Sequence, residues 1–244
     1  MSLSPWAARL NEKYFGDSIH PYAIFEDLVK CHLAPGKTLL DAGCGHGAPV
    51  LRKFVGAAKE LIGIDLVDFD QPVSGVTLLK RNLANTQLPD ESVDVIMSRS
   101  VMEHIADPVA TYREMSRLLR PSGHFIFLTA NMWDYASIIA KVVPNRYHPW
   151  IVARTQGRDE RDTFPVQYKT NTRRAVMRYA SGAGLDVMSF DYLGQYPAYF
   201  LFSGPLFLLA TGYEKLINRY STLRCLKGWI LVVLQKPGNG SRAG

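Results

Sequence analysis

The sequence of 244 residues is poor in cysteine, and its three cysteines, Cys31, Cys44 and Cys225, lie far apart without a CxxC pair. An odd number of isolated cysteines excludes a disulfide framework and the common zinc-binding cysteine patterns. The N-terminal region also lacks a basic segment followed by an apolar one, which is the pattern of a secretory leader. We therefore expect reduced thiols, a cytoplasmic location and no metal site.

Internal repeats and low-complexity tracts are absent too, and only 20% of the residues are charged against 47% that are hydrophobic. This composition excludes an intrinsically disordered chain and predicts a globular one. The length suits a single α/β domain with elaborations, which we place at 1–236. Residues 237–244 are rich in Gly, Ser and Arg, and we expect them to form a disordered tail.

Three glycines alternate in the segment 39–47, Leu-Leu-Asp-Ala-Gly-Cys-Gly-His-Gly. The apolar residues at its start predict a strand over 38–41, and the apolar spacing after it predicts a helix over 48–55. Glycine is needed where the backbone takes a positive φ or approaches a ligand closely. A strand, a glycine loop and a helix in this order present bare backbone and a helix N-terminus to a bound cofactor.

A carboxylate ends the next predicted strand, where Asp65 follows Gly63-Ile64 about 20 residues beyond the glycine loop. An acidic side chain at this spacing can accept hydrogen bonds from both hydroxyls of a ribose. We infer that the chain binds a nucleoside-containing cofactor.

The glycines alone leave the kind of cofactor open, because Gly43–Ala48 also satisfies the G-x-G-x-x-G/A pattern of dinucleotide binders. Asp41 favours a different ligand. Its negative charge, directly before the glycine turn, would oppose a pyrophosphate but suits a ligand that carries an ammonium and a sulfonium. NAD chemistry stays as an alternative.

Three further motifs follow in order: Asn82-Leu83, the segment 88–98 (LPDESVDVIMS), and 101–108 (VMEHIADP) leading to a helix that ends in Arg-Pro-Ser-Gly at 120–123. Together with the glycine loop they make residues 33–131 resemble the class I S-adenosylmethionine-dependent methyltransferases, in particular the small-molecule, type 11-like branch. The chain departs from that pattern at Asn82, where Asp is usual, and at His46 and Ser122, which replace small residues or glycine.

The resemblance implies that S-adenosyl-L-methionine is the cofactor and that it lies at the carboxyl ends of the first strands. The chain's residues at the matching positions are Asp41, Gly43, Cys44, Gly45, Gly47, Asp65, Leu66, Asn82, Leu83 and Ser98. At Asn82 an amide oxygen would meet the exocyclic amine of adenine in place of a carboxylate. Cys44 needs only to be small, and we expect it to be structural.

The fold class that we expect is α/β, a doubly wound, Rossmann-like sheet that is mostly parallel, with seven strands and helices on both faces. We also expect helical insertions after the fifth strand and between the last two strands. The predicted strands cover 38–41, 61–65, 77–80, 93–98, 124–129, 185–193 and 229–235.

The first 32 residues predict a helical cap, interrupted at 14–22 by an aromatic-rich loop with Gly and Pro. In the family that the chain resembles, such a segment often closes over the cofactor. Tyr14 and His20 are candidate substrate-binding residues for this reason. Ordinary packing of aromatic side chains is the alternative for both.

The segment 131–171 forms a basic insertion. Between Lys141 and Arg178 there are nine basic residues against three acidic ones, an excess that equals the chain's whole net charge of +6. Local positive charge concentrates anionic ligands. Arg146, Arg154 and Tyr168 are therefore candidate substrate-binding residues, with a solvated surface rich in ion pairs as the alternative.

The segment 192–213 contains no charged residue and belongs to an apolar insertion that we place at 194–227. It is interrupted at Pro197, Ser203-Gly204-Pro205 and Gly212, which is unlike a membrane-spanning helix. We expect two short helices, either buried as a lid over the substrate or paired in a homodimer. Contact with a membrane surface is the less favoured alternative.

Methyl transfer is an in-line attack on an activated methyl group, which needs alignment and desolvation more than acid–base groups. A base helps when the nucleophile is a hydroxyl. His104 is the first candidate because it follows the fourth strand; Glu103 could orient it, and His148 is the second candidate. A role for His104 in packing is the alternative.

The expected function is methyl transfer to a small molecule, most simply O-methylation of an acidic or phenolic metabolite. A lipid-linked or amphiphilic acceptor at a membrane surface is the alternative, ahead of RNA methylation, NAD-dependent oxidoreduction and a non-enzymatic binder. The (D/N)PP(Y/F) signature of base-methylating enzymes is absent after the fourth strand, which reads Ser98-Arg99-Ser100-Val101. We therefore expect no nucleic-acid partner.

Overall fold

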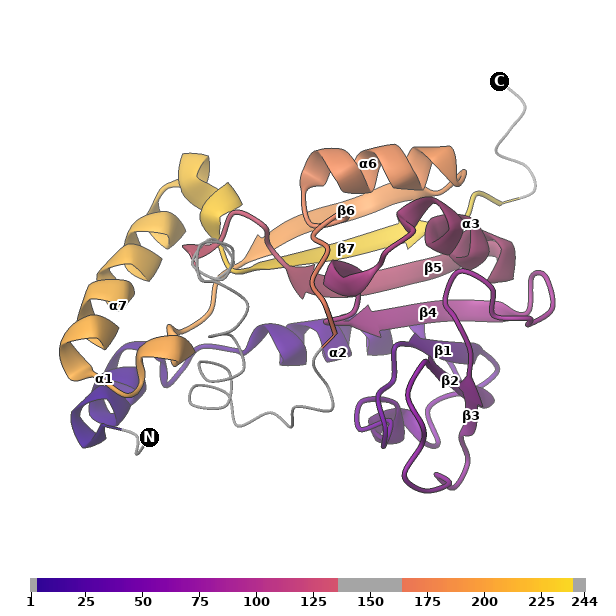
Figure 1. Ribbon diagram of the computed structural model, residues 1–244, viewed down its shortest axis with the longest axis horizontal. Helices are drawn as coiled ribbons and strands as arrows, with labels where there is room; N and C mark the ends of the chain where they lie inside the picture. The colour runs from indigo at the N-terminus through magenta and orange to yellow at the C-terminus, as the bar shows by residue number, and fades with distance from the viewer. Residues whose placement is uncertain (1–3, 136–163, 239–244) are drawn as a thin grey trace. The chain divides into compact units, whose positions relative to one another are not determined.

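The computed structural model describes residues 4–135 and 164–238 (Figure 1). Its chain forms two compact units. The sheet unit consists of Ile24–Thr129, Val166–Asp191 and Leu231–Gly244, and the helical unit consists of Met1–Ala23, Ala130–Pro165 and Tyr192–Ile230. The division into one domain with two insertions stays a prediction.

Seven strands form one sheet in the order β3-β2-β1-β4-β5-β7-β6. Their bounds are β1 Thr38–Ala42, β2 Glu60–Asp65, β3 Thr77–Lys80, β4 Val93–Arg99, β5 Leu119–Ala130, β6 Asp186–Leu193 and β7 Trp229–Gln235. The predicted fold class is thereby confirmed. The one sizeable difference in bounds is β5, which begins at Leu119 and not at residue 124.

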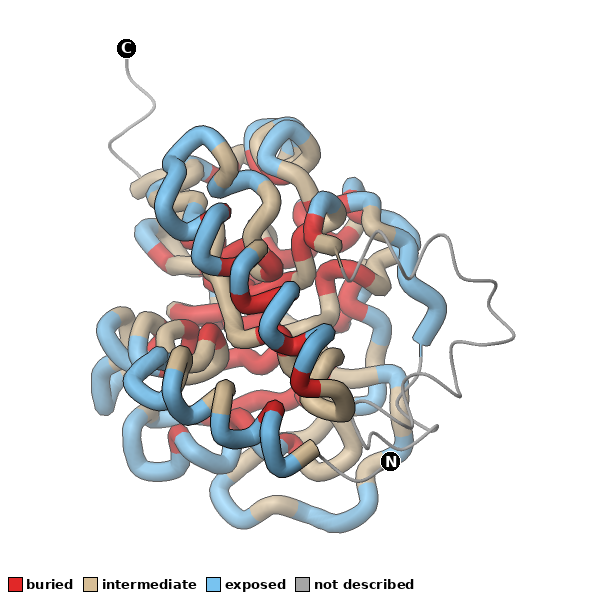
Figure 2. The backbone as a smooth tube through the Cα atoms, turned by 90° about the vertical axis from the view of Figure 1, so that its left-hand side faces the viewer, coloured by how far each residue is buried: buried red, intermediate tan, exposed pale blue. Residues whose placement is uncertain are grey.

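The first five strands are paired in parallel, and β1 lies between β2 and β4 with Asp41 opposite Gly63 and Met97. β7 runs against β5, because backbone hydrogen bonds join Ser122 to Lys236 at one end and Asn131 to Gly228 at the other. The strands β1 and β4 are apolar along most of their length because both of their faces are buried (Figure 2).

Two helices cover opposite faces of β5, as expected from the predicted fold class. His32 of α2 (Pro21–His32) lies against His124, with ring centroids 4.5 Å apart. Tyr112 of α3 (Pro108–Leu118) lies 6.1 Å from the ring of Phe125. Side chains alternate between the two faces of a strand, so α2 and α3 must lie on different faces. The helix α6 (Arg173–Gly182) packs beside α3.

The helix predicted over 48–55 is wrong. Only a 3₁₀ helix, η1 (Leu51–Phe54), forms in this connection. Pro49 disfavours the right-handed helical region for the residue before it, and Ala48 takes a φ of +45°. Gly56, at a φ of +85°, then turns the chain toward β2. The glycine loop is therefore followed by a second turn where a helix N-terminus was expected.

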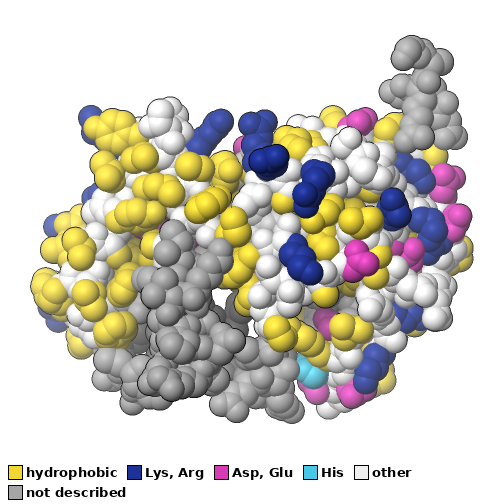
Figure 3. All heavy atoms as spheres, turned by 45° about the horizontal axis from the view of Figure 1, so that its top comes forward, with side chains coloured by type: hydrophobic (Ala, Val, Ile, Leu, Met, Phe, Trp, Pro, Cys, Tyr) yellow, Lys and Arg dark blue, Asp and Glu magenta, His cyan; other side chains and the backbone are white. Residues whose placement is uncertain are grey.

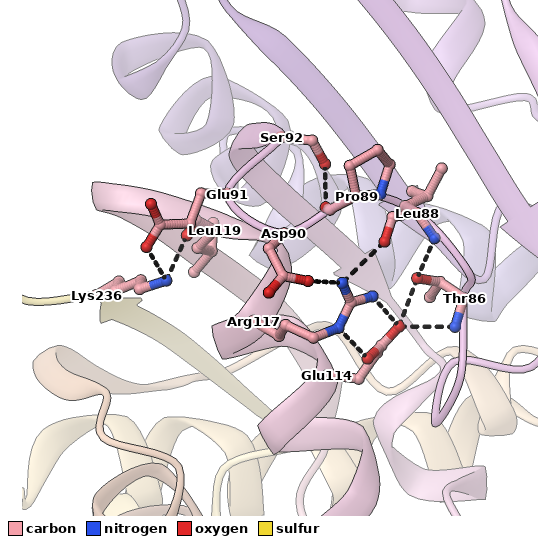
Figure 4. A network of polar contacts seen from close by, with 10 residues as sticks. All are labelled: Thr86, Leu88, Pro89, Asp90, Glu91, Ser92, Glu114, Arg117, Leu119 and Lys236. Atoms are coloured by element: carbon pink, nitrogen blue, oxygen red, sulfur yellow. Dashed lines mark hydrogen bonds and ion pairs between the residues drawn. The ribbon is translucent and has the colours of Figure 1, made fainter.

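A polar network fixes the loop 86–92 to α3 (Figure 4). Arg117 donates to both carboxylate oxygens of Glu114, to Leu88 O and to Asp90, and Thr86 donates to Glu114 from its N–H and its hydroxyl. Burial raises the pKa of Glu114, but the bonds from Arg117 and Thr86 outweigh it and lower the pKa to about 2. The residues directly before β4 thus anchor the loop 86–92 to α3.

In the helical unit, α1 (Pro5–Phe15) packs on α7 (Gly204–Arg219). Gly204 is required there because a Cβ would lie 2.0 Å from the ring of Trp6. Short 3₁₀ helices, Ala198–Phe200 and Ser221–Leu226, flank α7.

The apolar segment differs from the expectation in two ways. Gly212 lies inside the 16-residue helix α7 and does not break it, because a single glycine costs only about 1 kcal/mol in a helix that is held by packing. Phe207 is buried as expected, whereas Leu206, Leu208 and Leu209 are exposed because α7 buries only one of its faces.

Candidate functional site

The glycine loop is tied to β2 at three backbone groups. The N–H groups of Gly43 and Cys44 both donate to Ile64 O, at 2.8 and 3.1 Å. The N–H of Gly45 donates to Oδ2 of Asp65 at 2.8 Å. The sequence places these two segments about 20 residues apart, and the parallel pairing of β1 with β2 brings their ends together.

The glycines of the loop have different reasons to be glycine. Gly43 has a φ of +91°, and a Cβ there would lie 2.2 Å from Cγ2 of Val101, so this position is set by packing inside the protein. Gly45 has a φ of +72°, and a Cβ at Gly45 or at Gly47 would meet no atom within 4 Å. Gly45 and Gly47 therefore border open space, where a ligand can approach the backbone.

Asp41, at the end of β1, is buried, and its Oδ2 makes no hydrogen bond to any residue within 4–135 or 164–238. Burial raises the pKa of this carboxyl to about 7; Arg99 lowers it and Asp65 raises it further. A buried carboxylate without a partner is costly, and a cation placed beside it would remove that cost. The site therefore fits a cofactor that carries an ammonium and a sulfonium.

Asp65 already accepts three backbone hydrogen bonds, from Gly45, Leu66 and Val67. A carboxylate offers about four acceptor positions, so about one remains for a ribose hydroxyl unless the loop yields another. Leu66 is 54% exposed beside it and can serve as an apolar surface for a base. Asn82 accepts the N–H of Ala84 at 2.8 Å, and Leu83 is buried.

Two of the predicted cofactor-binding residues have side chains that face the protein interior. The hydroxyl of Ser98 is fully buried and donates to Ala42 O at 2.8 Å, which braces β4 against β1. Cys44 is buried, and a Cβ on Gly63 would lie 2.8 Å from its Sγ. Burial, together with Asp41, raises the pKa of this thiol. The thiol of Cys44 is thus buried and disfavoured as a thiolate, and the hydroxyl of Ser98 is already engaged by the backbone of β1.

The candidate catalytic residues Glu103 and His104 lie on a 3₁₀ helix, η2 (Met102–His104), directly after β4. The carboxylate of Glu103 is buried and accepts the hydroxyl of Thr129 at 2.7 Å. That hydroxyl accepts in turn from Nδ2 of Asn171 at 2.8 Å. Glu103 therefore holds β5 and the chain before α6 together, while His104 is partly exposed.

A strap formed by residues 167–171 crosses η2. The N–H groups of Gln167 and Tyr168 donate to Glu103 O at 2.7 and 3.0 Å, and the hydroxyl of Thr170 donates to Met102 O at 2.7 Å. Tyr168 has a φ of +51°, a strained value for a bulky residue, and such strain often occurs at functional sites. The structure thus brings Tyr168, a predicted substrate residue, beside the predicted catalytic pair.

Sequence reasoning missed Thr129, Thr170 and Asn171. Each is a short polar residue that is fully buried. The only signal in the sequence is a run of Thr and Asn at 170–172 directly before a helix, and that run reads equally well as a helix cap. Among the described ranges, no group of three or more His, Cys, Asp or Glu side chains is placed to hold a metal ion.

The remaining predicted residues lie outside the described residues or in the helical unit. Arg146, His148 and Arg154 lie outside the described residues. Tyr14 and His20 belong to the helical unit. The ammonium of Lys215 lies 4.1 Å from the ring centroid of Tyr14, and Nδ1 of His20 accepts the N–H of Tyr22. His20 also lines an open pocket of about 320 Å³ within that unit.

Comparison with known proteins agrees with this geometry. A family model described as "Methyltransferase domain" matches residues 40–127. A probable S-adenosylmethionine-dependent methyltransferase of Mycolicibacterium smegmatis is 36% identical over 106 residues, which cover 41% of this chain and 40% of that protein. A ubiquinone biosynthesis O-methyltransferase of Acinetobacter baumannii is 29% identical over 107 residues, which cover 39% of this chain and 45% of that protein.

The aligned part thus spans less than half the length of these relatives. A solved structure similar in fold is an S-adenosylmethionine-dependent methyltransferase from Mesorhizobium loti. Its TM-score is 0.52 at 16% identity, over 86% of this chain and 96% of that one. Residues 40–127 therefore match the methyltransferase domain model, and the chain has a seven-stranded Rossmann-like fold similar to that of solved S-adenosylmethionine-dependent methyltransferases.

Proposed function

We propose that this chain binds S-adenosylmethionine and transfers its methyl group to a small-molecule acceptor. The observation that carries the proposal is Asp41, a buried carboxylate with an unpartnered oxygen at the end of β1. It lies beside a glycine loop that borders open space. A pyrophosphate would place negative charge against this carboxylate, so a dinucleotide is disfavoured.

The chain's own residues have distinct roles in this proposal. Asp41 attracts the cationic end of the cofactor, Asp65 accepts a hydroxyl of its ribose, and Leu66 covers its base. The backbone at Gly45 and Gly47 permits close approach. When bound, the cofactor supplies an already activated methyl group, so the protein needs mainly to align the acceptor and exclude water.

An acceptor hydroxyl, phenolic or carboxylic, fits the site best. His104 follows β4 and is partly exposed, and this supports the proposal that it takes the proton of a phenol or alcohol as the new bond forms. The ubiquinone O-methyltransferase among the relatives, which is named as an O-methylating enzyme, supports this choice. An amphiphilic acceptor is the second candidate, favoured by the exposed leucines of α7.

Titration calorimetry of the full chain with S-adenosylhomocysteine and with NAD tests the cofactor. We expect binding of S-adenosylhomocysteine by the wild type, loss of binding in Asp41→Asn, and no binding of NAD. The reverse preference would overturn the assignment. Transfer of labelled methyl from S-adenosylmethionine to phenolic, carboxylic, lipid and tRNA acceptors then identifies the acceptor class. Transfer to tRNA alone would exclude a small molecule.

A further inference from the structure

The outward face of α7 is apolar although the helix lies at the surface of its unit. Leu206, Leu208, Leu209 and Leu216 are 42%, 43%, 75% and 49% exposed. At 100° per residue, Pro205, Leu209, Gly212 and Leu216 fall along the middle of the exposed side. Phe207, Ala210, Thr211, Glu214 and Ile217 fall on the opposite side and are buried. We call the exposed side the leucine face.

Aromatic side chains of the kind that favour a membrane interface occur at both ends of this face. Trp6 of α1 is half exposed, and its ring lies over Gly204 at the start of α7. Tyr220 follows the last residue of α7 and is 49% exposed. Trp and Tyr are enriched where an apolar phase meets water, because their rings are apolar and their N–H or O–H groups are polar.

The exposed charge on the segment that carries the leucine face has one sign. The segment 192–230 contains four basic residues, Lys215, Arg219, Arg224 and Lys227. Its only acidic residue is Glu214, which is fully buried. By the same helical geometry, Lys215 and Arg219 lie along one border of the leucine face. Figure 3 shows hydrophobic side chains gathered over this part of the surface, with Lys and Arg at its margin.

This charge decides between the candidate occupants of the face. Anionic lipid headgroups attract basic side chains that border an apolar surface. A second copy of the same face would bring Lys215 and Arg219 toward like charges and is therefore disfavoured. A helix of 16 residues is about 24 Å long, and no helix in 4–135 or 164–238 is long and apolar enough to cross a bilayer. A flat orientation on the bilayer surface suits these properties.

We propose that the leucine face of α7, together with Trp6 and the bordering Lys215 and Arg219, binds the surface of an anionic lipid bilayer. This inference goes beyond methyl transfer and does not depend on it. It gives the chain a location at which an amphiphilic acceptor would be concentrated.

Sedimentation of the full chain with vesicles tests the proposal. We expect binding to vesicles of phosphatidylcholine with 30% phosphatidylglycerol, weak binding to pure phosphatidylcholine, and release by high salt. Leu209→Glu and Leu216→Glu should each weaken binding to the anionic vesicles by tenfold or more, as should the double variant Lys215→Glu, Arg219→Glu. The matched control is Met188→Glu, which changes an exposed apolar residue on β6 and should bind as the wild type does.

Two further measurements keep the outcomes distinct. Circular dichroism shows whether each variant is folded, and calorimetry with S-adenosylhomocysteine should give unchanged affinity for Leu209→Glu, so that failure of cofactor binding is separate from failure of membrane binding. Equal binding to neutral and anionic vesicles, or no binding to either, would overturn the proposal. Analytical ultracentrifugation that finds a dimer, dissociated by Leu209→Glu, would also overturn it and assign the face to a second copy.

Discussion

The carboxylate of Asp65 accepts the backbone N–H of Gly45 at 2.8 Å, and so joins the end of β2 to the middle of the glycine loop. One side chain thus shapes the loop and is also the residue assigned to the ribose. Substitutions at Asp65 therefore change both the conformation of the glycine loop and the affinity for the cofactor.

Asp65→Ala removes the loop anchor and the acceptor for the ribose. A hydrogen bond to a charged group contributes about 1.5–3 kcal/mol, so we expect the affinity for S-adenosylhomocysteine to fall by a factor of about 10 to 150. Titration calorimetry measures the change. The control is Asp70→Asn, an exposed carboxylate near the same loop, which should bind as the wild type does. Equal losses in the two variants would contradict the role of Asp65.

Gly43→Ala should mainly lower the stability of the protein, whereas Gly45→Ala should mainly lower its affinity for the cofactor. Both force a positive φ on alanine, at a cost of about 1–2 kcal/mol. Gly43→Ala also collides with Val101, so it should lower the melting temperature further, and Val101→Ala should restore part of the loss. Gly45→Ala meets no protein atom, so most of its effect should appear as lost cofactor affinity. Thermal unfolding and calorimetry separate the two effects, and an identical pattern for both variants would refute this distinction.

His104→Asn should lower turnover about 10²- to 10⁴-fold if His104 accepts the proton of the acceptor hydroxyl. The dissociation constant for S-adenosylhomocysteine should change little. Steady-state kinetics at several pH values measures the fall in turnover. A fall of less than about threefold at every pH would show that alignment alone suffices.

Glu103→Gln is the companion variant. Because the carboxylate of Glu103 accepts from Thr129 inside the protein, we expect it to alter stability more than the pH profile.

The affinity for the cofactor should be linked to the protonation of Asp41. Burial raises its pKa to about 7, above the ordinary 3.8, so the folded protein holds this proton more tightly than the unfolded chain does. The free energy of unfolding therefore falls, through this group, as the pH rises from about 4 to about 7. A bound cation lowers the pKa, so binding near pH 6 should release a proton. Calorimetry in two buffers of different ionisation enthalpy detects the release, which should vanish in Asp41→Asn.

Glu214→Gln should stabilise the protein at high pH. Glu214 is fully buried. Burial and then Asp134 raise its pKa to about 8, while Lys227 opposes them. The folded state is therefore penalised as the pH rises from about 4.5 to about 8. Urea unfolding should show a free energy of unfolding that is higher in the variant by on the order of 3 kcal/mol at pH 9 and nearly equal to that of the wild type at pH 4. The control variant Glu12→Gln, which changes an exposed carboxylate, should leave the free energy of unfolding unchanged at both pH values.

The strands could be predicted from the sequence because each is a short apolar run bounded by turn residues, and the strand predicted over 229–235 has the bounds of β7. The helix over 48–55 was wrong because its apolar spacing was real but Pro49 and Gly56 determined the local backbone. Apolar residues at helical spacing predict which face of a helix would be buried. They do not predict whether the local backbone can adopt the helix.

The candidate site was only partly accessible to prediction. Asp41 and Asp65 lie at the carboxyl ends of the neighbouring strands β1 and β2, and Gly45 lies in the loop after β1, so motif spacing alone locates them. The inward orientation of Ser98 could not be foreseen, because both faces of β4 are buried and its side chains do not alternate in polarity. The strap 167–171 meets η2 through contacts between residues more than 60 positions apart, and no local pattern encodes them.

The division of the chain into two units has a consequence for how this protein can be altered. Each unit is assembled from three separate stretches of sequence, and the chain passes between the units five times. Neither unit can be transferred to another protein by exchanging one continuous stretch of a gene.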